Sequence, residues 1–166
     1  TEYIEKYGGA AAALAKAGYT SLAIDWRGQG LSDRLLPNRL IGHVCRFSDY
    51  QQDVRTLITA AETLDLPKPY FLMAHSMGGC IGLRSLMQGL AVPAVSFSAP
   101  MWGLGRRVSP GPLLRVPIRV AKRLGWDERG LAWSTPKDPP AFENNPLTHD
   151  PERFAWAHEP WVRDPR

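Results

Sequence analysis

The chain has little cysteine and no long apolar run, and each of these shortages excludes a class of protein. Its two cysteines, Cys45 and Cys80, form no CxxC pair and no metal-ligand spacing with the four histidines. Neither a disulfide framework nor a metal site is therefore expected. No stretch approaches the ~20 apolar residues of a membrane span, and residues 1–18 lack the features of a signal peptide. The default expectation is a cytoplasmic protein.

The charge balance is modest and argues against nucleic acid as a partner. The 166 residues carry a formal net charge of +4. Basic residues are not interleaved with aromatic ones, as a groove for nucleic acid requires. A hydrophobic content of 44% and a charged content of 22% are typical of a globular protein.

Strand and helix patterns alternate along the first hundred residues. Apolar spacing predicts helices over residues 2–17, 47–65 and 79–88, and short strands over 20–25, 70–74 and 94–98. For the helix at 47–65, Ser48 is the expected cap, Gln51 occupies the capping-box position, and Pro67 ends the pattern. This alternation predicts an α/β fold with a parallel sheet flanked by helices.

The most informative segment is Ala74-His75-Ser76-Met77-Gly78, which lies between a predicted strand and a predicted helix. Ser76 is therefore expected on a sharp strand-to-helix turn, in a strained backbone conformation. Such a turn presents a serine hydroxyl at the end of a sheet, beside N–H groups of the helix that can stabilise an oxyanion. Bulky side chains two residues before or after the serine would be expected to collide across such a turn, and the small residues Ala74 and Gly78 avoid this collision. The pattern predicts Ser76 as a nucleophile and the Met77 backbone N–H as an oxyanion donor; the alternative is a turn serine that caps the helix.

A second glycine-rich strand end precedes this turn, at Asp25-Trp26-Arg27-Gly28-Gln29-Gly30-Leu31-Ser32. Its glycines permit tight turning, and Asp25 and Arg27 can bond backbone groups of the loop, so a structural role is expected. Gly28-Gln29-Gly30 lacks a third glycine and does not open a helix, which argues against a dinucleotide site.

Together these two segments resemble the α/β-hydrolase superfamily, in its branch of lysophospholipases, monoacylglycerol lipases and serine aminopeptidase-like proteins. There an Asp-x-Arg-Gly-x-Gly-x-Ser loop precedes a Gly-His-Ser-Met-Gly-Gly turn. The resemblance spans about residues 1–103 and departs from the family at Ala74, where glycine is usual. It implies a partial hydrolase core over residues 1–100, a partial cap or lid over 101–166, and a serine hydrolase that uses no cofactor and no metal.

The resemblance also implies the order serine, acid, histidine along the chain. The acid and the histidine of the triad are expected beyond Arg166, so the chain alone is expected to be inactive and its full-length parent active. His149 and His158 follow Ser76, but in a stretch without strand ends to present them. His75 adjoins Ser76 and is expected to pack beside the site. No closing strand or helix is predicted near the last residues.

The stretch after Pro100 bears on the substrate. Ten of the 15 prolines and five of the six tryptophans lie beyond this residue, and residues 104–125 hold six basic side chains and no acidic one. The tryptophans suit either an acyl-chain pocket or the core of a cap, and the basic residues suit either a solvated face or contact with an anionic membrane surface. We expect a hydrolase of lysophospholipids, monoacylglycerols or small esters. The alternatives are a proline-iminopeptidase-like serine peptidase and a non-catalytic binding module.

Overall fold

The computed structural model describes residues 3–39, 41–103, 117, 120, 121, 123, 142–144 and 148–163. The chain divides into two compact units, one formed by Thr1–Cys45 with Gly125–Arg166 and the other by Arg46–Leu124. The expected division into residues 1–100 and 101–166 stays a prediction, because most of the second range lies outside the described residues.

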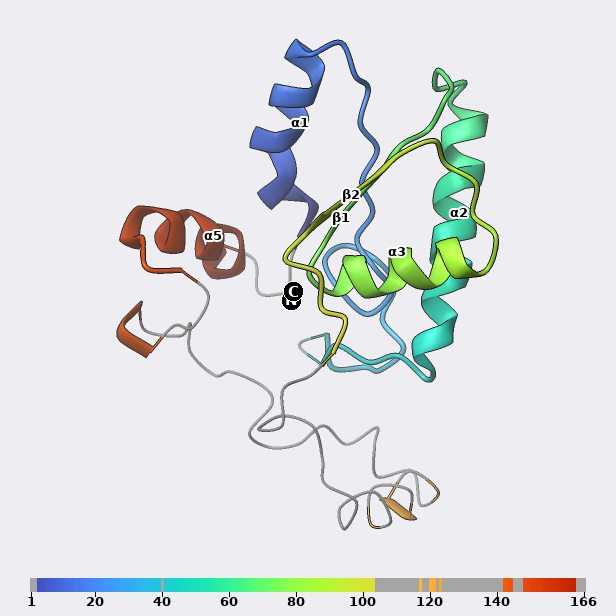
Figure 1. Cartoon of the computed structure of the whole chain (residues 1–166). Coiled ribbons are helices and arrows are strands. Elements are labelled where there is room, and N and C mark those ends of the chain that lie inside the picture. The colour runs from blue at the N-terminus through green and yellow to red at the C-terminus, as the bar shows by residue number, and fades with distance from the viewer. Residues whose placement is uncertain are drawn as a thin grey trace. The chain divides into compact units, whose positions relative to one another are not determined.

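The unit Arg46–Leu124 contains a parallel pair of strands (Figure 1). β1 (Leu72–His75) pairs with β2 (Val95–Ser98), with Leu72 opposite Val95 and His75 opposite Ser98. The connection between them contains α3 (Met77–Met87), which packs against β1 and against α2 (Tyr50–Thr63). The predicted strand, helix and strand are therefore present, and the α/β fold class is confirmed.

The start of α2 differs from its prediction. A 3₁₀ turn, Phe47–Asp49, precedes the helix, and the Asp49 carboxylate accepts a hydrogen bond from the Arg46 N–H at 3.1 Å. The prediction that Ser48 caps this helix was wrong, because a carboxylate one residue later satisfies a backbone N–H at the helix entrance.

Gln51 also has another role than the predicted capping box. Its side chain is buried, and its Nε2 donates to the Ile81 carbonyl at 3.2 Å while its Oε1 accepts from the Ser85 hydroxyl at 2.8 Å. Ile81 is fully buried. The glutamine therefore links α2 to α3 inside the core, where each of its bonds replaces one that water would otherwise supply.

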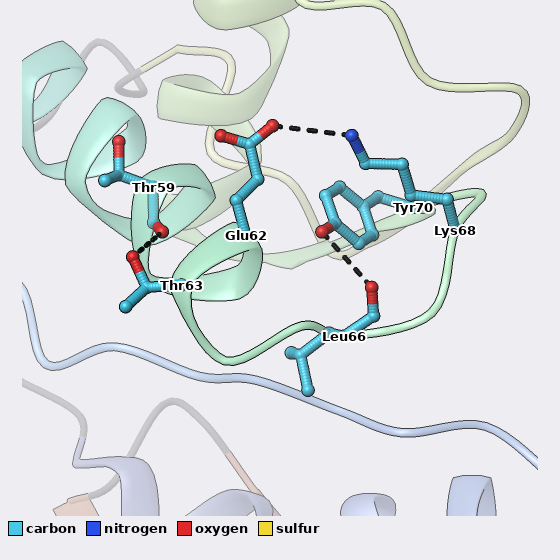
Figure 2. Close-up of polar contacts among 6 residues, drawn as sticks. All are labelled: Thr59, Glu62, Thr63, Leu66, Lys68 and Tyr70. Carbon is cyan, nitrogen blue, oxygen red and sulfur yellow. Dashed lines mark hydrogen bonds and ion pairs between the residues drawn. The ribbon is translucent and has the colours of Figure 1, made fainter.

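The far end of α2 is followed by a turn with local polar contacts (Figure 2). The Tyr70 hydroxyl donates to the Leu66 carbonyl at 3.3 Å, and the Lys68 ammonium lies 3.5 Å from the Glu62 carboxylate. Both charged side chains are more than half exposed, so this ion pair contributes about 0–1 kcal/mol. α2 ends at Thr63, shortly before the end predicted at residue 65.

The steric limit expected at Gly78 is found one residue later. A Cβ at Gly78 would meet no atom of the described part within 4 Å, whereas a Cβ at Gly79 would lie 2.6 Å from the Cβ and 2.9 Å from the Cα of Pro100. The expectation at Gly78 was wrong because α3 approaches the chain that leaves β2 at Gly79. Gly82 lies close to the sheet, since a Cβ there would lie 3.1 Å from Leu72 Cδ2.

We expect Gly79→Ala to destabilise the protein by about 1–3 kcal/mol, because a proline ring and its backbone offer no flexible atom that can move aside. Gly78→Ala is the matched control and should range from neutral to about 1 kcal/mol stabilising, since alanine favours helix over glycine. Urea unfolding of both variants measures the difference. Equal midpoints would contradict the close contact at Gly79.

In the other unit, the first predicted helix is present. A 3₁₀ turn, Ile4–Tyr7, leads into α1 (Gly8–Lys16), and the chain leaves the helix at Gly18, which has a φ of 84°. The Tyr19 N–H then donates to the Leu14 carbonyl at 3.0 Å, as in a glycine-terminated helix. The strand predicted at 20–25 is not formed. Within the described ranges these residues pair with no strand, and an isolated extended segment has no ladder to define it.

The expectation that no helix closes the chain was also wrong, because α5 spans Pro151–Arg163. Asp150 Oδ1 accepts hydrogen bonds from the N–H groups of Glu152 at 2.9 Å and Arg153 at 3.1 Å. Aspartate as the cap with proline at the first helical position is a strong start signal that the sequence does carry. In the part of the chain that the structure describes, no helix has the length and apolarity to cross a membrane.

Candidate active site

Ser76 lies between the last residue of β1 and the first residue of α3, with a φ of 49° and a ψ of −121°. A positive φ costs a non-glycine residue of order 1–3 kcal/mol, and it persists only where the surrounding structure enforces it. The predicted strained turn between strand and helix is therefore present.

Three backbone hydrogen bonds hold this conformation. The Ser76 N–H donates to the Ser98 carbonyl at 3.2 Å, and the Ser76 carbonyl accepts from the N–H groups of Gly79 at 3.0 Å and Met101 at 2.9 Å. Ser98 ends β2 and Met101 lies three residues beyond it. The strained residue is therefore bonded through its N–H to the end of β2 and through its carbonyl to the chain that follows β2.

The Ser76 side chain is partly exposed, and its hydroxyl does not cap α3. A serine that serves as a helix cap accepts a hydrogen bond from an N–H in the first turn. The alternative interpretation of Ser76 as a capping residue is therefore not supported.

Met77 is the first residue of α3, so its N–H has no acceptor within the helix. This N–H forms no hydrogen bond within the described ranges. It lies at the positive end of the helix dipole and directly follows Ser76, the geometry in which a backbone N–H stabilises an oxyanion.

His75 is engaged at the end of the strand pair. Its Nδ1 lies 3.1 Å from the Ser98 hydroxyl oxygen, and the two residues lie opposite each other in the sheet. His75 is the only histidine in the sequence between Arg46 and Leu124. His149, which is exposed, and His158, which lies in α5, belong to the other unit.

In that unit, the glycine-rich loop is built around the buried Asp25 carboxylate. Its Oδ1 accepts from the Ile4 N–H at 3.0 Å and its Oδ2 from the Leu31 N–H at 2.9 Å. Gly30 has a φ of 52°, and a Cβ there would lie 2.1 Å from Asp25 Cγ. Gly28 has a φ of 78°, and its Cβ would lie 2.6 Å from the His43 carbonyl oxygen. These contacts give the motif the structural role that the sequence predicts.

An arginine outside the motif, Arg34, also supports this loop. It donates to the carbonyls of Ser32 at 2.7 Å, Gly30 at 2.8 Å and Arg39 at 3.0 Å. Burial lowers the pKa of Arg34 from its ordinary value, with a further contribution from the like charge of Arg39. The sequence interpretation missed this residue, because nothing in the local pattern separates it from a surface arginine.

The structure describes only part of the predicted cap at residues 101–166. Trp102 packs edge-on against Phe97 with ring centroids 5.5 Å apart, and it is 58% exposed. Trp126 and Trp133 lie outside the described residues, as does most of the basic stretch at 104–125. The pocket and membrane interpretations of these residues stay predictions. Within the described ranges, no group of three or more His, Cys, Asp or Glu residues is placed to hold a metal ion.

Comparison with known proteins places this arrangement in a family. The serine aminopeptidase S33 family matches residues 1–163. Lysophospholipase L2 of Escherichia coli K12 is 33% identical over 95% of this chain and 48% of its own length. Probable lysophospholipase L2 of Haemophilus influenzae is 30% identical over 85% of the chain and 44% of its own length. Phospholipase YtpA of Bacillus subtilis is 33% identical over 56% of the chain and 34% of its own length.

The chain thus spans about half the length of the lysophospholipases that it matches. No solved structure matches it significantly. The family match covers nearly all of the chain, and the strained serine turn and parallel strand pair agree with it. The chain belongs to the serine aminopeptidase S33 family of α/β-hydrolases.

Proposed function

We propose that the whole protein is a serine hydrolase of carboxylic esters, with Ser76 as the nucleophile and the Met77 N–H as one oxyanion donor. The observation that carries this proposal is the φ of 49° at Ser76, whose hydroxyl does not cap α3 and which directly precedes Met77, the first residue of that helix. Backbone strain of this kind clusters at active sites.

The chemistry that we propose is acyl transfer in two steps. Ser76 Oγ attacks the ester carbonyl, its proton passes to a histidine base, and the oxyanion that forms accepts a hydrogen bond from the Met77 N–H. The alcohol leaves with that proton. Water then attacks the acyl-enzyme, the histidine takes a proton from this water, and the proton returns to Ser76 Oγ as the acid product leaves. We place the histidine, its acid and the second oxyanion donor outside this chain, as the resemblance implies.

For the substrate we propose a lysophospholipid. The named function of two relatives supports this choice, and monoacylglycerols are the nearest alternative class. The family description also includes peptidases, so a serine peptidase of the proline-iminopeptidase type is the second candidate. A binding module without turnover is the third.

A substrate panel with active-site labelling separates these candidates. The full-length protein should hydrolyse lysophosphatidylcholine faster than p-nitrophenyl butyrate or an aminoacyl-naphthylamide, and a fluorophosphonate should label it. Preference for the naphthylamide would favour the peptidase. Failure to label or to hydrolyse any ester would favour the binding module. The 166-residue chain, assayed in parallel, should show little or no turnover.

We also propose that the basic stretch at 104–125 contacts anionic lipid. If so, the full-length protein should hydrolyse lysophospholipid faster on anionic than on neutral micelles, and the difference should shrink as salt rises. Replacing Arg115, Arg119, Lys122 and Arg123 by Gln should remove this preference and leave hydrolysis of a soluble ester intact. Equal losses on both substrates would instead assign the stretch to folding of the cap.

A further inference from the structure

The peptide unit between Ser76 and Met77 connects the two groups of the proposed site. A trans peptide is planar, and its C=O and N–H point in opposite directions. The direction of the Met77 N–H is therefore fixed by whatever holds the Ser76 carbonyl. That carbonyl accepts two hydrogen bonds, from Gly79 at 3.0 Å and from Met101 at 2.9 Å.

These two donors differ in what they fix. Gly79 belongs to α3 itself, so its bond closes a local turn and moves with the helix. Met101 comes from the chain that leaves β2. Its N–H fixes the Ser76–Met77 plane relative to the strand pair.

The two residues before Met101 direct the backbone toward the Ser76 carbonyl. Ala99 has a φ of 41°, a region that costs a non-glycine residue energy and that is disfavoured before proline. Pro100 then lies against Gly79, where no Cβ could be accommodated. The strain at Ala99 turns the chain back toward α3, and Met101 N–H meets the Ser76 carbonyl directly after it.

We propose that the backbone N–H of Met101 is a positioning group that aims the Met77 N–H at the oxyanion, an inference that rests on the proposed function of this turn. Without this bond the plane retains only the local donor from Gly79, and the Met77 N–H can swing. Loss of a complete oxyanion donor costs about 10²–10³ in rate, so misalignment of one should cost roughly 10-fold to 10²-fold in kcat.

The test replaces one backbone N–H by an oxygen atom. In the full-length protein, Met101 is replaced by its α-hydroxy acid, so that an ester takes the place of the amide and the N–H donor is lost. Met101→Leu is the matched control, because it changes the side chain and keeps the N–H. The measurements are kcat and KM on a soluble ester, inhibition by a trifluoromethyl ketone that forms an oxyanion on serine, and the ¹⁵N order parameter of Met77.

In the ester variant we expect kcat and trifluoromethyl ketone affinity to fall by the same factor, KM to stay constant, and the order parameter of Met77 to drop. The leucine variant should match the wild type. An unchanged Met77 order parameter, or equal changes in both variants, would overturn the proposal. A wild-type protein that neither labels nor hydrolyses esters would refute the proposed function. A fall in the Met77 order parameter in the ester variant would still support its positioning by Met101.

Discussion

Replacing Ser76 by Ala is expected to lower the kcat of the full-length protein for ester hydrolysis by roughly 10⁴ to 10⁶ fold, with little change in KM. The hydroxyl forms no cap to α3, so its removal should change the free energy of unfolding by less than about 0.5 kcal/mol. Activity and stability should therefore separate, as they do for a nucleophile and not for a structural serine. The measurements are steady-state kinetics and urea unfolding on the same preparations.

Two further variants sharpen this test. Ser96→Ala removes an exposed serine of β2 and should retain full activity. Ser76→Gly should be as inactive as Ser76→Ala yet more stable by about 1 kcal/mol, because glycine adopts a positive φ without the cost that Ser76 bears. Substantial activity in Ser76→Ala would exclude Ser76 as the nucleophile. A Ser76→Gly variant less stable than Ser76→Ala would contradict the strained turn.

Gly30→Ala is expected to destabilise the protein by about 3–5 kcal/mol, a large part of the total stability of an ordinary domain. The new methyl group would meet Asp25 Cγ at 2.1 Å in a backbone with a φ of 52°. Asp25 is short, buried and bonded to the N–H groups of Ile4 and Leu31. It cannot move without leaving these two donors unsatisfied, and the cost of that loss adds to the backbone strain.

Gly18→Ala provides the control for backbone strain alone. Gly18 has a φ of 84°, and a Cβ there would meet no described atom within 4 Å. This variant should lose about 1–2 kcal/mol, the cost of the left-handed region by itself. The free energies of unfolding of both variants are measured by chemical unfolding monitored by far-UV circular dichroism. If Gly30→Ala lost no more than Gly18→Ala, the Asp25 carboxylate would not be the anchor of its loop.

The features that the sequence predicted correctly depend on residues close together in the chain. Apolar spacing and a small-residue turn suffice for β1, α3 and β2, and the turn places Ser76 at their junction. The helix α2, which buries Tyr50 and Ala61, follows the helical periodicity of its apolar residues, and α1 forms where it was predicted although none of its residues is buried. These signals are local, so they do not require knowledge of which segments meet in space.

The features that the sequence did not predict depend on contacts between distant residues. Gly79 has no room for a side chain because Pro100 lies against it. The buried Gln51 of α2 has its hydrogen-bond partner, Ser85, on the neighbouring helix α3. Arg34 and Met101 act through backbone carbonyls, which carry no sequence signature. The expected strand at 20–25 failed for the same reason, since apolar composition does not supply a pairing partner.

The bond between Gln51 and Ser85 constrains how the two positions can evolve. Removing one partner leaves the other buried and unsatisfied, at a cost of about 1–3 kcal/mol, whereas replacing both by apolar residues of similar shape can be almost neutral. A lineage that changes one position first passes through a weakened intermediate. Related sequences should therefore covary at 51 and 85, with the polar pair retained or exchanged as a unit.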